Sequence, residues 1–133
     1  MRTSSTETKG VNMDSTTFCS ALLFWSAVHF VGDFGLQSAW MAMKKCPKNY
    51  DPTVDCAGPW EVLLYHCMTY TSAFVVMAKL SGADANLCVF AVIFLAHFLV
   101  DALKARDILV KTIWLDQTLH LLTLLPLILL GWL

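Results

Sequence analysis

Charged residues are scarce in this chain. Only 14% of its 133 residues are Asp, Glu, Lys or Arg, and they leave a net charge of −1. No long basic or acidic run occurs, so nothing in the sequence favours nucleic acid as a partner. With 57% hydrophobic residues and a mean hydropathy of +0.61, the chain is too apolar and too short for a soluble multidomain enzyme.

Cysteine and proline are also few, and their positions restrict what they can do. Three of the five cysteines lie in apolar segments, where a thiol packs as a small hydrophobic group: Cys19, Cys67 and Cys88. Only Cys46 and Cys56 share a loop and could form a disulfide or bind a metal. Their spacing fits no strong metal motif, so we interpret them as loop thiols. The loop, residues 41–59, holds three of the four prolines and is predicted to be irregular.

Long apolar segments dominate the rest of the chain. A helix needs about 20 apolar residues to cross a bilayer. Four segments meet that length: about residues 16–40, 60–80, 83–104 and 113–133. Because the last three are joined by short links, the sequence predicts an all-α, integral membrane, up-down-up-down four-helix bundle. We expect one domain over residues 16–133, preceded by a polar, flexible tail over residues 1–15. No small-residue cleavage site follows the first apolar segment, which we interpret as a retained helix.

All four histidines fall inside these apolar segments. Three of them lie four residues from an aspartate: His29/Asp33, His97/Asp101 and Asp116/His120. Residues at this spacing share one face of a helix. An ionisable side chain inside a bilayer costs at least ~2.5 to 3.5 kcal/mol, so a set of seven that includes His66 indicates a functional site.

An antiparallel bundle would bring these residues to one level. We take one residue of each helix as a marker of the membrane interface: Trp40, Trp60, Lys104 and Trp114. From them, at ~1.5 Å per residue, Asp33 and His97 lie about 10 Å deep, and His66 and His120 about 9 Å. His29 and Asp101 fall within one further turn. The sequence therefore predicts a convergent polar site near one membrane face.

We predict that this site binds one or two divalent metal ions, with zinc as the first candidate. The predicted ligands are His29, Asp33, His66, His97, Asp101, Asp116 and His120. Imidazole and carboxylate donors suit zinc and also iron, manganese and nickel. Asp33 or Asp116 would be the catalytic residue, acting as a base toward a metal-bound water. A buried His–Asp hydrogen-bond network without metal, such as a proton relay, is the alternative.

Four more polar residues are candidates for binding a substrate: Lys104, Arg106, Gln37 and Tyr70. Lys104 and Arg106 would face an anionic group such as a lipid phosphate. The ordinary role of such cations at a helix end is to anchor the helix at the membrane–water interface. The ordinary role of Gln37 and Tyr70 is a hydrogen bond between helices.

Four blocks of sequence resemble a known family: HFVGDFGLQSAWMAMKK, LLYHCMTYTSAF, LAHFLVDALKAR and WLDQTLHLL. The family comprises small bacterial and phage membrane proteins classified as a domain of unknown function, and the resemblance spans about residues 25–125. It implies a bacterial inner-membrane location but no established activity. The pattern is more loosely similar to membrane-bound metal-dependent hydrolases. The loop CPKNYDPTVDC departs from the family pattern by its length and its two cysteines.

Three functions fit these features. The first is a metal-dependent hydrolase at the membrane interface, with the bilayer as partner and a lipid or anionic amphiphile as substrate. The second is a metal or proton transporter or channel. Because the half of each helix remote from the site is apolar, a homo-oligomer would have to supply the remaining path. The third is a structural or interaction protein, phage-encoded or bacterial.

The basic residues predict the orientation of the bundle. Six of the nine Lys and Arg residues flank the connections at the site end: Lys44, Lys45, Lys48, Lys104, Arg106 and Lys111. The other three are Arg2, Lys9 and Lys79. The positive-inside rule therefore predicts that the site face is cytoplasmic.

Overall fold

The computed structural model describes residues 14–83 and 85–133, whose regular structure is entirely helical. The described residues form five α-helices: α1 (Ser15–Phe30), α2 (Ala39–Lys44), α3 (Pro59–Ser81), α4 (Leu87–Ala105) and α5 (Ile113–Leu129). The expected all-helical class is confirmed. Of the flexible tail expected over residues 1–15, residues 1–13 lie outside the described part of the chain. Asp14 caps α1 and Ser15 is its first residue.

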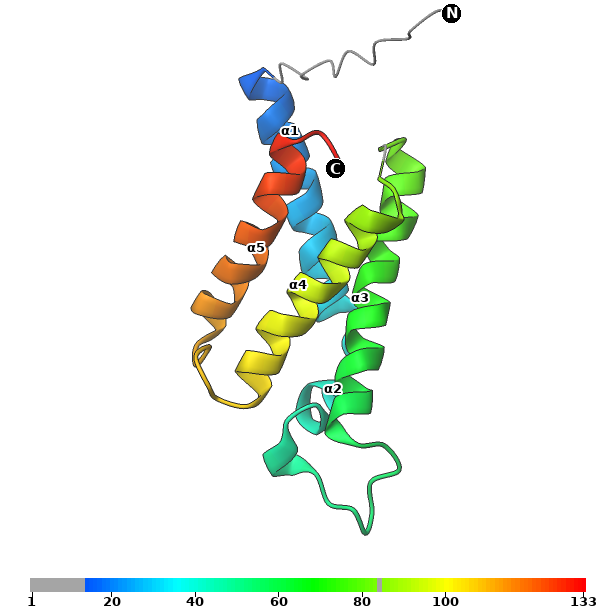
Figure 1. Cartoon of the computed structure of the whole chain (residues 1–133), viewed down its shortest axis with the longest axis vertical. Helices are drawn as coiled ribbons and strands as arrows, with labels where there is room; N and C mark the ends of the chain where they lie inside the picture. Colours follow the sequence, from blue (N-terminus) through cyan, green and yellow to red (C-terminus); the bar gives the residue numbers. More distant parts are fainter. Residues whose placement is uncertain (1–13, 84) are drawn as a thin grey trace, which may run out of the picture.

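The four long helices lie side by side and alternate in direction (Figure 1). In that view α1 and α4 run toward the lower end, and α3 and α5 run back toward the upper end. Both α1 and α4 contact α3 and α5. At the lower end, the last turn of α4 lies near the first turns of α3 and α5, and α2 contacts α3. Helix α1 ends higher, where His29 bonds Tyr70 in the middle of α3.

Local sequence sets where the long helices begin and end. The side chains of Asp14, Asn86 and Thr112 accept hydrogen bonds from backbone N–H groups in the first turns of α1, α4 and α5. Helix α3 begins at Pro59, whose missing N–H costs nothing in a first turn. It ends at Gly82, whose φ of 75° is left-handed and favours glycine.

The segment expected as a single helix over residues 16–40 is divided in the structure. Helix α1 passes into a π-helical turn, Val31–Gly35, in which the N–H of Leu36 bonds the carbonyl of Val31, five residues back, at 2.9 Å. This turn contains two glycines, which are poor α-helix formers. Ser38 then caps the separate helix α2. The last helix is also shorter than expected, ending at Leu129 rather than 133.

Apolar side chains fill the upper half of the bundle. Trp25 of α1 stacks on Phe74 of α3, with ring centroids 5.7 Å apart and planes 8° apart. Ile93 of α4 and Leu124 of α5 belong to the same buried cluster. The buried residues of each long helix recur at spacings of three and four, as expected for one inward face. The histidines and aspartates continue these faces toward the lower end.

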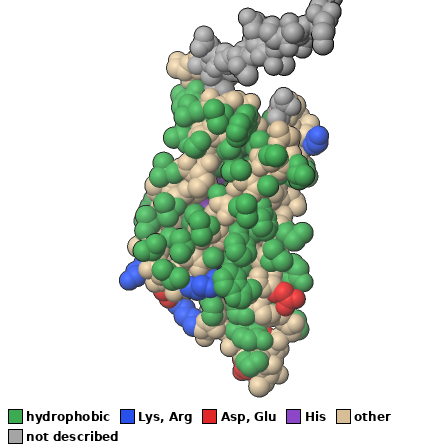
Figure 2. All heavy atoms as spheres, viewed as in Figure 1, with side chains coloured by type: hydrophobic (Ala, Val, Ile, Leu, Met, Phe, Trp, Pro, Cys, Tyr) green, Lys and Arg blue, Asp and Glu red, His purple; other side chains and the backbone are tan. Residues whose placement is uncertain are grey.

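Large apolar side chains also cover the outside of the long helices. Leu23, Val76, Leu95 and Leu122 are each more than half exposed. Figure 2 shows apolar side chains over most of one face, with charged side chains gathered mainly toward the lower end. Two helical segments are long and apolar enough to cross a membrane: Ser15–Gly35 and Leu87–Ala105, with mean hydropathies of 1.3 and 2.1. By length and composition alone, a core helix of a soluble protein or a signal sequence also qualifies.

Candidate metal centre

The histidines and aspartates singled out in the sequence gather inside the lower half of the bundle. All seven are at most 4% exposed: His29, Asp33, His66, His97, Asp101, Asp116 and His120. They come from α1, the π-helical turn, α3, α4 and α5. Burial of so many ionisable groups is costly unless they bind one another or a metal.

Four donor atoms of this set lie at the spacing of ligands around one metal ion. His66 Nε2 is 3.1 Å from His97 Nε2, 3.2 Å from Asp33 Oδ1 and 3.1 Å from Asp101 Oδ2. His97 Nε2 is 3.7 Å from Asp33 Oδ1 and 3.9 Å from Asp101 Oδ2. Tetrahedral ligands about 2.0 to 2.1 Å from a zinc ion lie roughly 3.3 Å from one another. The three distances from His66 are slightly shorter than this value and the two from His97 are longer, so shifts of a few tenths of an ångström would bring these pairs to that geometry.

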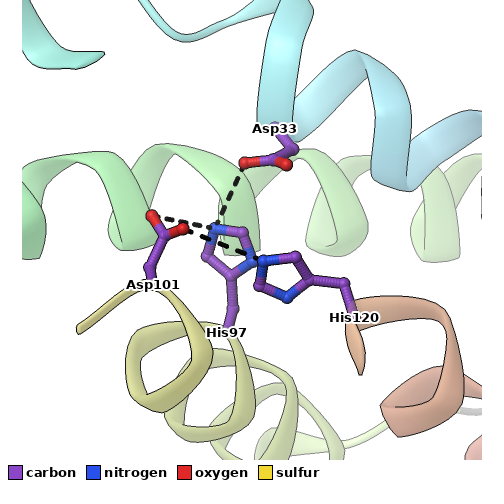
Figure 3. Close-up of side chains that lie close together, drawn as sticks. All are labelled: Asp33, His97, Asp101 and His120. Carbon is purple, nitrogen blue, oxygen red and sulfur yellow. Dashed lines mark ion pairs between the residues drawn. The ribbon is translucent and has the colours of Figure 1, made fainter. Parts of the chain in front are cut away.

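His120 extends the group from α5. Asp33, His97, Asp101 and His120 each offer an atom, and these four atoms lie within 4.8 Å of one another (Figure 3). This buried group could hold a metal ion. Imidazole nitrogens and carboxylate oxygens suit zinc, iron and manganese alike, so these donors do not identify the metal.

Tyr70 orients the imidazole rings. Its ring lies parallel to that of His97, with centroids 3.6 Å apart and planes 5° apart. The Tyr70 hydroxyl is 3.0 Å from His29 Nδ1, and the other nitrogen of His29 is 2.8 Å from Gln117 Oε1. Both His29 nitrogens are thus engaged in hydrogen bonds, and this residue lies beside the group formed by Asp33, His97, Asp101 and His120. Tyr70, expected to bind substrate, is likewise 2% exposed and lies inside the cluster.

Gln117 connects two of the carboxylates. Its amide nitrogen donates to Asp33 Oδ2 at 2.8 Å and to Asp116 Oδ2 at 3.0 Å. These bonds leave Oδ1 of each aspartate directed toward the histidines, at 3.2 Å from His66 for Asp33 and 3.5 Å from His120 for Asp116. The sequence prediction did not include Gln117 among the site residues. Its position directly after the predicted ligand Asp116 is the sequence feature that could have indicated a place in the site.

Two lysines reach the carboxylates from the lower end. Lys45 Nζ lies 2.5 Å from Asp101 Oδ2, and Lys104 Nζ pairs with Asp116 Oδ2. Lys45 is buried, whereas about a third of the Lys104 side chain is exposed (32%). With neutral imidazoles, the three carboxylates and two ammonium groups leave one negative charge, which a divalent ion would convert to one positive charge. The sequence prediction missed Lys45 because this residue follows α2, outside any apolar periodicity.

The other predicted site residues lie away from the cluster. Gln37 follows the π-helical turn, and its buried amide nitrogen has no hydrogen-bond partner within the described ranges. The Arg106 guanidinium carbon lies 3.3 Å from the centroid of the Trp60 ring, as in a cation–π contact. Cys46 and Cys56 are both free thiols.

Comparison with known proteins gives a family but no activity. No curated protein and no solved structure matches the chain. One family profile, described as "Protein of unknown function (DUF3307)", matches residues 21–132. The match covers the five helices almost completely and includes every residue of the cluster. The chain therefore belongs to the DUF3307 family of unknown function.

Proposed function

We propose that this protein is a metal-dependent membrane hydrolase that acts on an anionic amphiphile at the membrane interface. A divalent ion, with zinc as the first candidate, would bind Asp33, His66, His97 and Asp101. One observation carries the proposal: five separations among these donor atoms are 3.1 to 3.9 Å, in a fully buried setting. Hydrogen bonds account for the close contacts of His66, but a meeting point of two imidazoles and two carboxylates is also the arrangement that a metal ion requires.

The exposed surface supports a membrane location. In the two segments that are long and apolar enough to cross a membrane, only 28% and 33% of an 18-residue window is buried, whereas a core helix of a soluble protein is mostly buried. Helix α1 also contributes Trp25 and His29 to the interior, and the adjoining turn contributes Asp33. A signal sequence destined for removal would not supply a core tryptophan and a ligand.

The charges of the cluster suit hydrolysis of an anionic substrate. A bound divalent metal lowers the pKa of a water molecule and supplies hydroxide at neutral pH. When only this ion is bound, Asp116 can accept a proton from that water, because its Oδ1 has no hydrogen-bond partner in the part of the chain described. Lys104 holds the other oxygen of Asp116 and is partly exposed, so it can meet an anionic group that arrives from the lower end.

An apolar groove beside the cluster suits the tail of an amphiphile. It lies between α1 and α3 and has a volume of about 470 Å³. Its lining includes Phe24, Val28, Val31, Leu36 and Met77. Val31 is the first residue of the π-helical turn that carries the proposed ligand Asp33, and Leu36 directly follows this turn. We propose that an acyl or prenyl chain occupies the groove while the headgroup reaches the metal.

Transport is the main rival. A transporter needs a polar path beyond the site, but Trp25, Phe74, Ile93 and Leu124 fill the upper half of the described interior. Within one chain, these side chains close the route. The geometry therefore favours chemistry at the site over passage through it.

Elemental analysis of purified protein is the first test. We expect stoichiometric transition metal in the parent protein and its loss in His97→Ala. Metal-free, well-folded parent protein after incubation with zinc, iron or manganese would overturn the proposal.

Turnover is the second test. Metal-loaded protein in lipid nanodiscs is screened against phospholipids and polyprenyl phosphates, with Asp33→Asn as the inactive variant. We expect consumption of one of these lipids by the parent only. If no lipid is consumed, and proteoliposomes show metal or proton flux that Asp33→Asn eliminates, the transporter replaces the hydrolase.

A further inference from the structure

The α5 side of the cluster holds buried polar atoms that the four ligands of the proposed metal do not use. Neither nitrogen of His120 has a hydrogen-bond partner among the described residues, and the same is true of Asp116 Oδ1. His120 Nε2 and Asp116 Oδ1 lie 3.5 Å apart, in residues that are 1% and 0% exposed. These two atoms are at ion-pair distance but make no hydrogen bond. Buried groups without hydrogen bonds are expensive, so this pair has donor atoms available for a shared ligand.

Asp101 lies between this pair and the first group. Its Oδ2 is 3.1 Å from His66 Nε2 and 3.9 Å from His97 Nε2. Its Oδ1 is 3.8 Å from His120 Nε2 on the opposite side. Figure 3 shows the two carboxylate oxygens facing different imidazole rings. A carboxylate in this position can join two metal ions, one at each oxygen.

We propose that the protein holds a second divalent cation, bound by Asp101 Oδ1, Asp116 Oδ1 and His120 Nε2, with Asp101 bridging the two ions. The proposal rests on the first metal described above. Ions in two-metal hydrolases lie about 3.5 to 4 Å apart, a distance that one carboxylate can span.

The two positions differ in how many protein ligands they offer. The first has four, from Asp33, His66, His97 and Asp101, as in closed sites. The second has three, as in catalytic sites that keep a position open for water or substrate. The second ion is thus the one that substrate would reach.

Lys104 and Gln117 support the geometry of the second position. Both donate to Asp116 Oδ2, which leaves Oδ1 directed toward His120. Lys104 is partly exposed, so its side chain connects Asp116 with the surface. A single ion shared by Asp33, His97, Asp101 and His120 is the competing arrangement, and it assigns no ligand role to Asp116.

The test is metal stoichiometry in the full-length chain. The purified protein and its variants are loaded with Zn²⁺, freed of excess ion and analysed for zinc. We expect about two equivalents in the parent and about one in Asp116→Asn and His120→Asn. The control, His29→Gln, alters a buried histidine that is not a ligand and should keep both.

A second readout keeps the proposal testable if a variant folds poorly. In Mn²⁺-loaded parent protein, two ions bridged by Asp101 should be magnetically coupled and give a broadened, weakened EPR spectrum. Asp116→Asn should give the spectrum of an isolated ion. Zero equivalents in the parent would overturn the proposed function itself. One equivalent, unchanged in Asp116→Asn and without coupling, would overturn the second site alone.

Discussion

At the scale of residues, His29 and His97 differ in the atoms that their ring nitrogens face. His97 Nε2 faces two carboxylates and His66, whereas His29 is bonded through both nitrogens to Tyr70 and Gln117. Both side chains are histidines, and both are buried. What differs is the set of atoms opposite each imidazole, and that set is decided by neighbouring helices.

We predict that His29→Ala and His97→Ala have different effects. His29→Ala leaves the Tyr70 hydroxyl and the Gln117 carbonyl without a partner, at about 1 to 3 kcal/mol for each unsatisfied group, yet it removes no ligand. His97→Ala should lose the metal. Thermal unfolding and elemental analysis of both variants check this. Retention of metal by His97→Ala together with its loss from folded His29→Ala would reverse the assignment.

The variant Tyr70→Phe separates the contribution of the Tyr70 hydroxyl to stability from that of its ring. Phenylalanine keeps the parallel stacking on His97 but removes the bond to His29 Nδ1. We expect a loss of about 1 to 3 kcal/mol in the free energy of unfolding, because a buried nitrogen loses its partner, and an unchanged metal content. Denaturant unfolding with parallel zinc analysis measures both. A variant as stable as the parent would show that the hydroxyl contributes nothing.

Much of the cluster could be predicted at this scale, but its pairing could not. The four-residue spacings identified His97, Asp101, Asp116 and His120, because such spacing fixes a shared helix face. The sequence did not reveal that Asp33 faces His66 and His97 rather than His29. The π-helical turn causes this difference, since one extra residue per turn rotates Asp33 relative to α1. Lys45 and Gln117 were not predicted as site residues, because contacts between different helices leave no periodic pattern in the sequence.

At the scale of elements, the π-helical turn controls where Asp33 points. Gly32 packs against Tyr70 so closely that a Cβ at this position would lie 2.9 Å from Tyr70 Cδ2. The tyrosine ring cannot yield easily, because it is 2% exposed and stacked on His97. Other elements begin and end as their caps predict, but nothing in the sequence required α1 to change to a π-helical turn.

Gly32→Ala should therefore disturb both stability and metal binding. Overpacking of this kind costs about 1 to 3 kcal/mol, and movement of Tyr70 would carry His97 with it. The matched control is Gly35→Ala in the same turn, where the new Cβ would meet only Val31 Cγ1 at 3.7 Å. Zinc affinity and melting temperature are compared. Equal zinc affinity and equal melting temperature in the two variants would contradict the proposed role of Gly32.

The loop before α3 is organised by Lys44 and Asp55. Asp55 Oδ2 accepts hydrogen bonds from the Asp51 N–H and from Lys44 Nζ, both at 2.8 Å. The Asp51 N–H and then the Lys44 ammonium lower the pKa of Asp55 below its ordinary value. A carboxylate with a lowered pKa stabilises the fold fully above its unfolded pKa, and this stabilisation is lost as the pH falls through the folded pKa.

Acid should thus loosen this loop selectively. We expect faster amide exchange in residues 46–58 as the pH falls below about 4, after correction for intrinsic exchange rates, with little change in α3. Asp55→Asn should show the faster exchange already at neutral pH. A loop whose corrected exchange is independent of pH, in parent and variant alike, would contradict the role of the ion pair.

At the scale of the whole molecule, the charges and the cluster lie at the same end. Among the described basic residues, Lys44, Lys45, Lys48, Lys104, Arg106 and Lys111 flank the lower connections, and Lys79 is near the opposite end of α3. The all-helical class followed from the long apolar segments. The membrane location and its orientation remain proposals, because length and apolarity do not show which solvent surrounds a helix.

Thiol labelling tests the orientation. Cys56 in the lower loop and Cys88 at the start of α4 are both free and exposed, at opposite ends of the bundle. In single-cysteine variants, the positive-inside rule predicts that a membrane-impermeant maleimide labels Cys88 in intact cells and Cys56 only after permeabilisation. The reverse pattern would place the metal centre on the outer face.

The central claim is that the buried histidines and aspartates hold metal, and X-ray absorption at the metal edge of zinc-loaded protein tests it most directly. The account predicts nitrogen and oxygen ligands at about 2.0 to 2.1 Å, outer-shell scattering from imidazole, and loss of this spectrum in His97→Ala. Sulfur ligands at about 2.3 Å would instead place the metal on the cysteines and contradict the account.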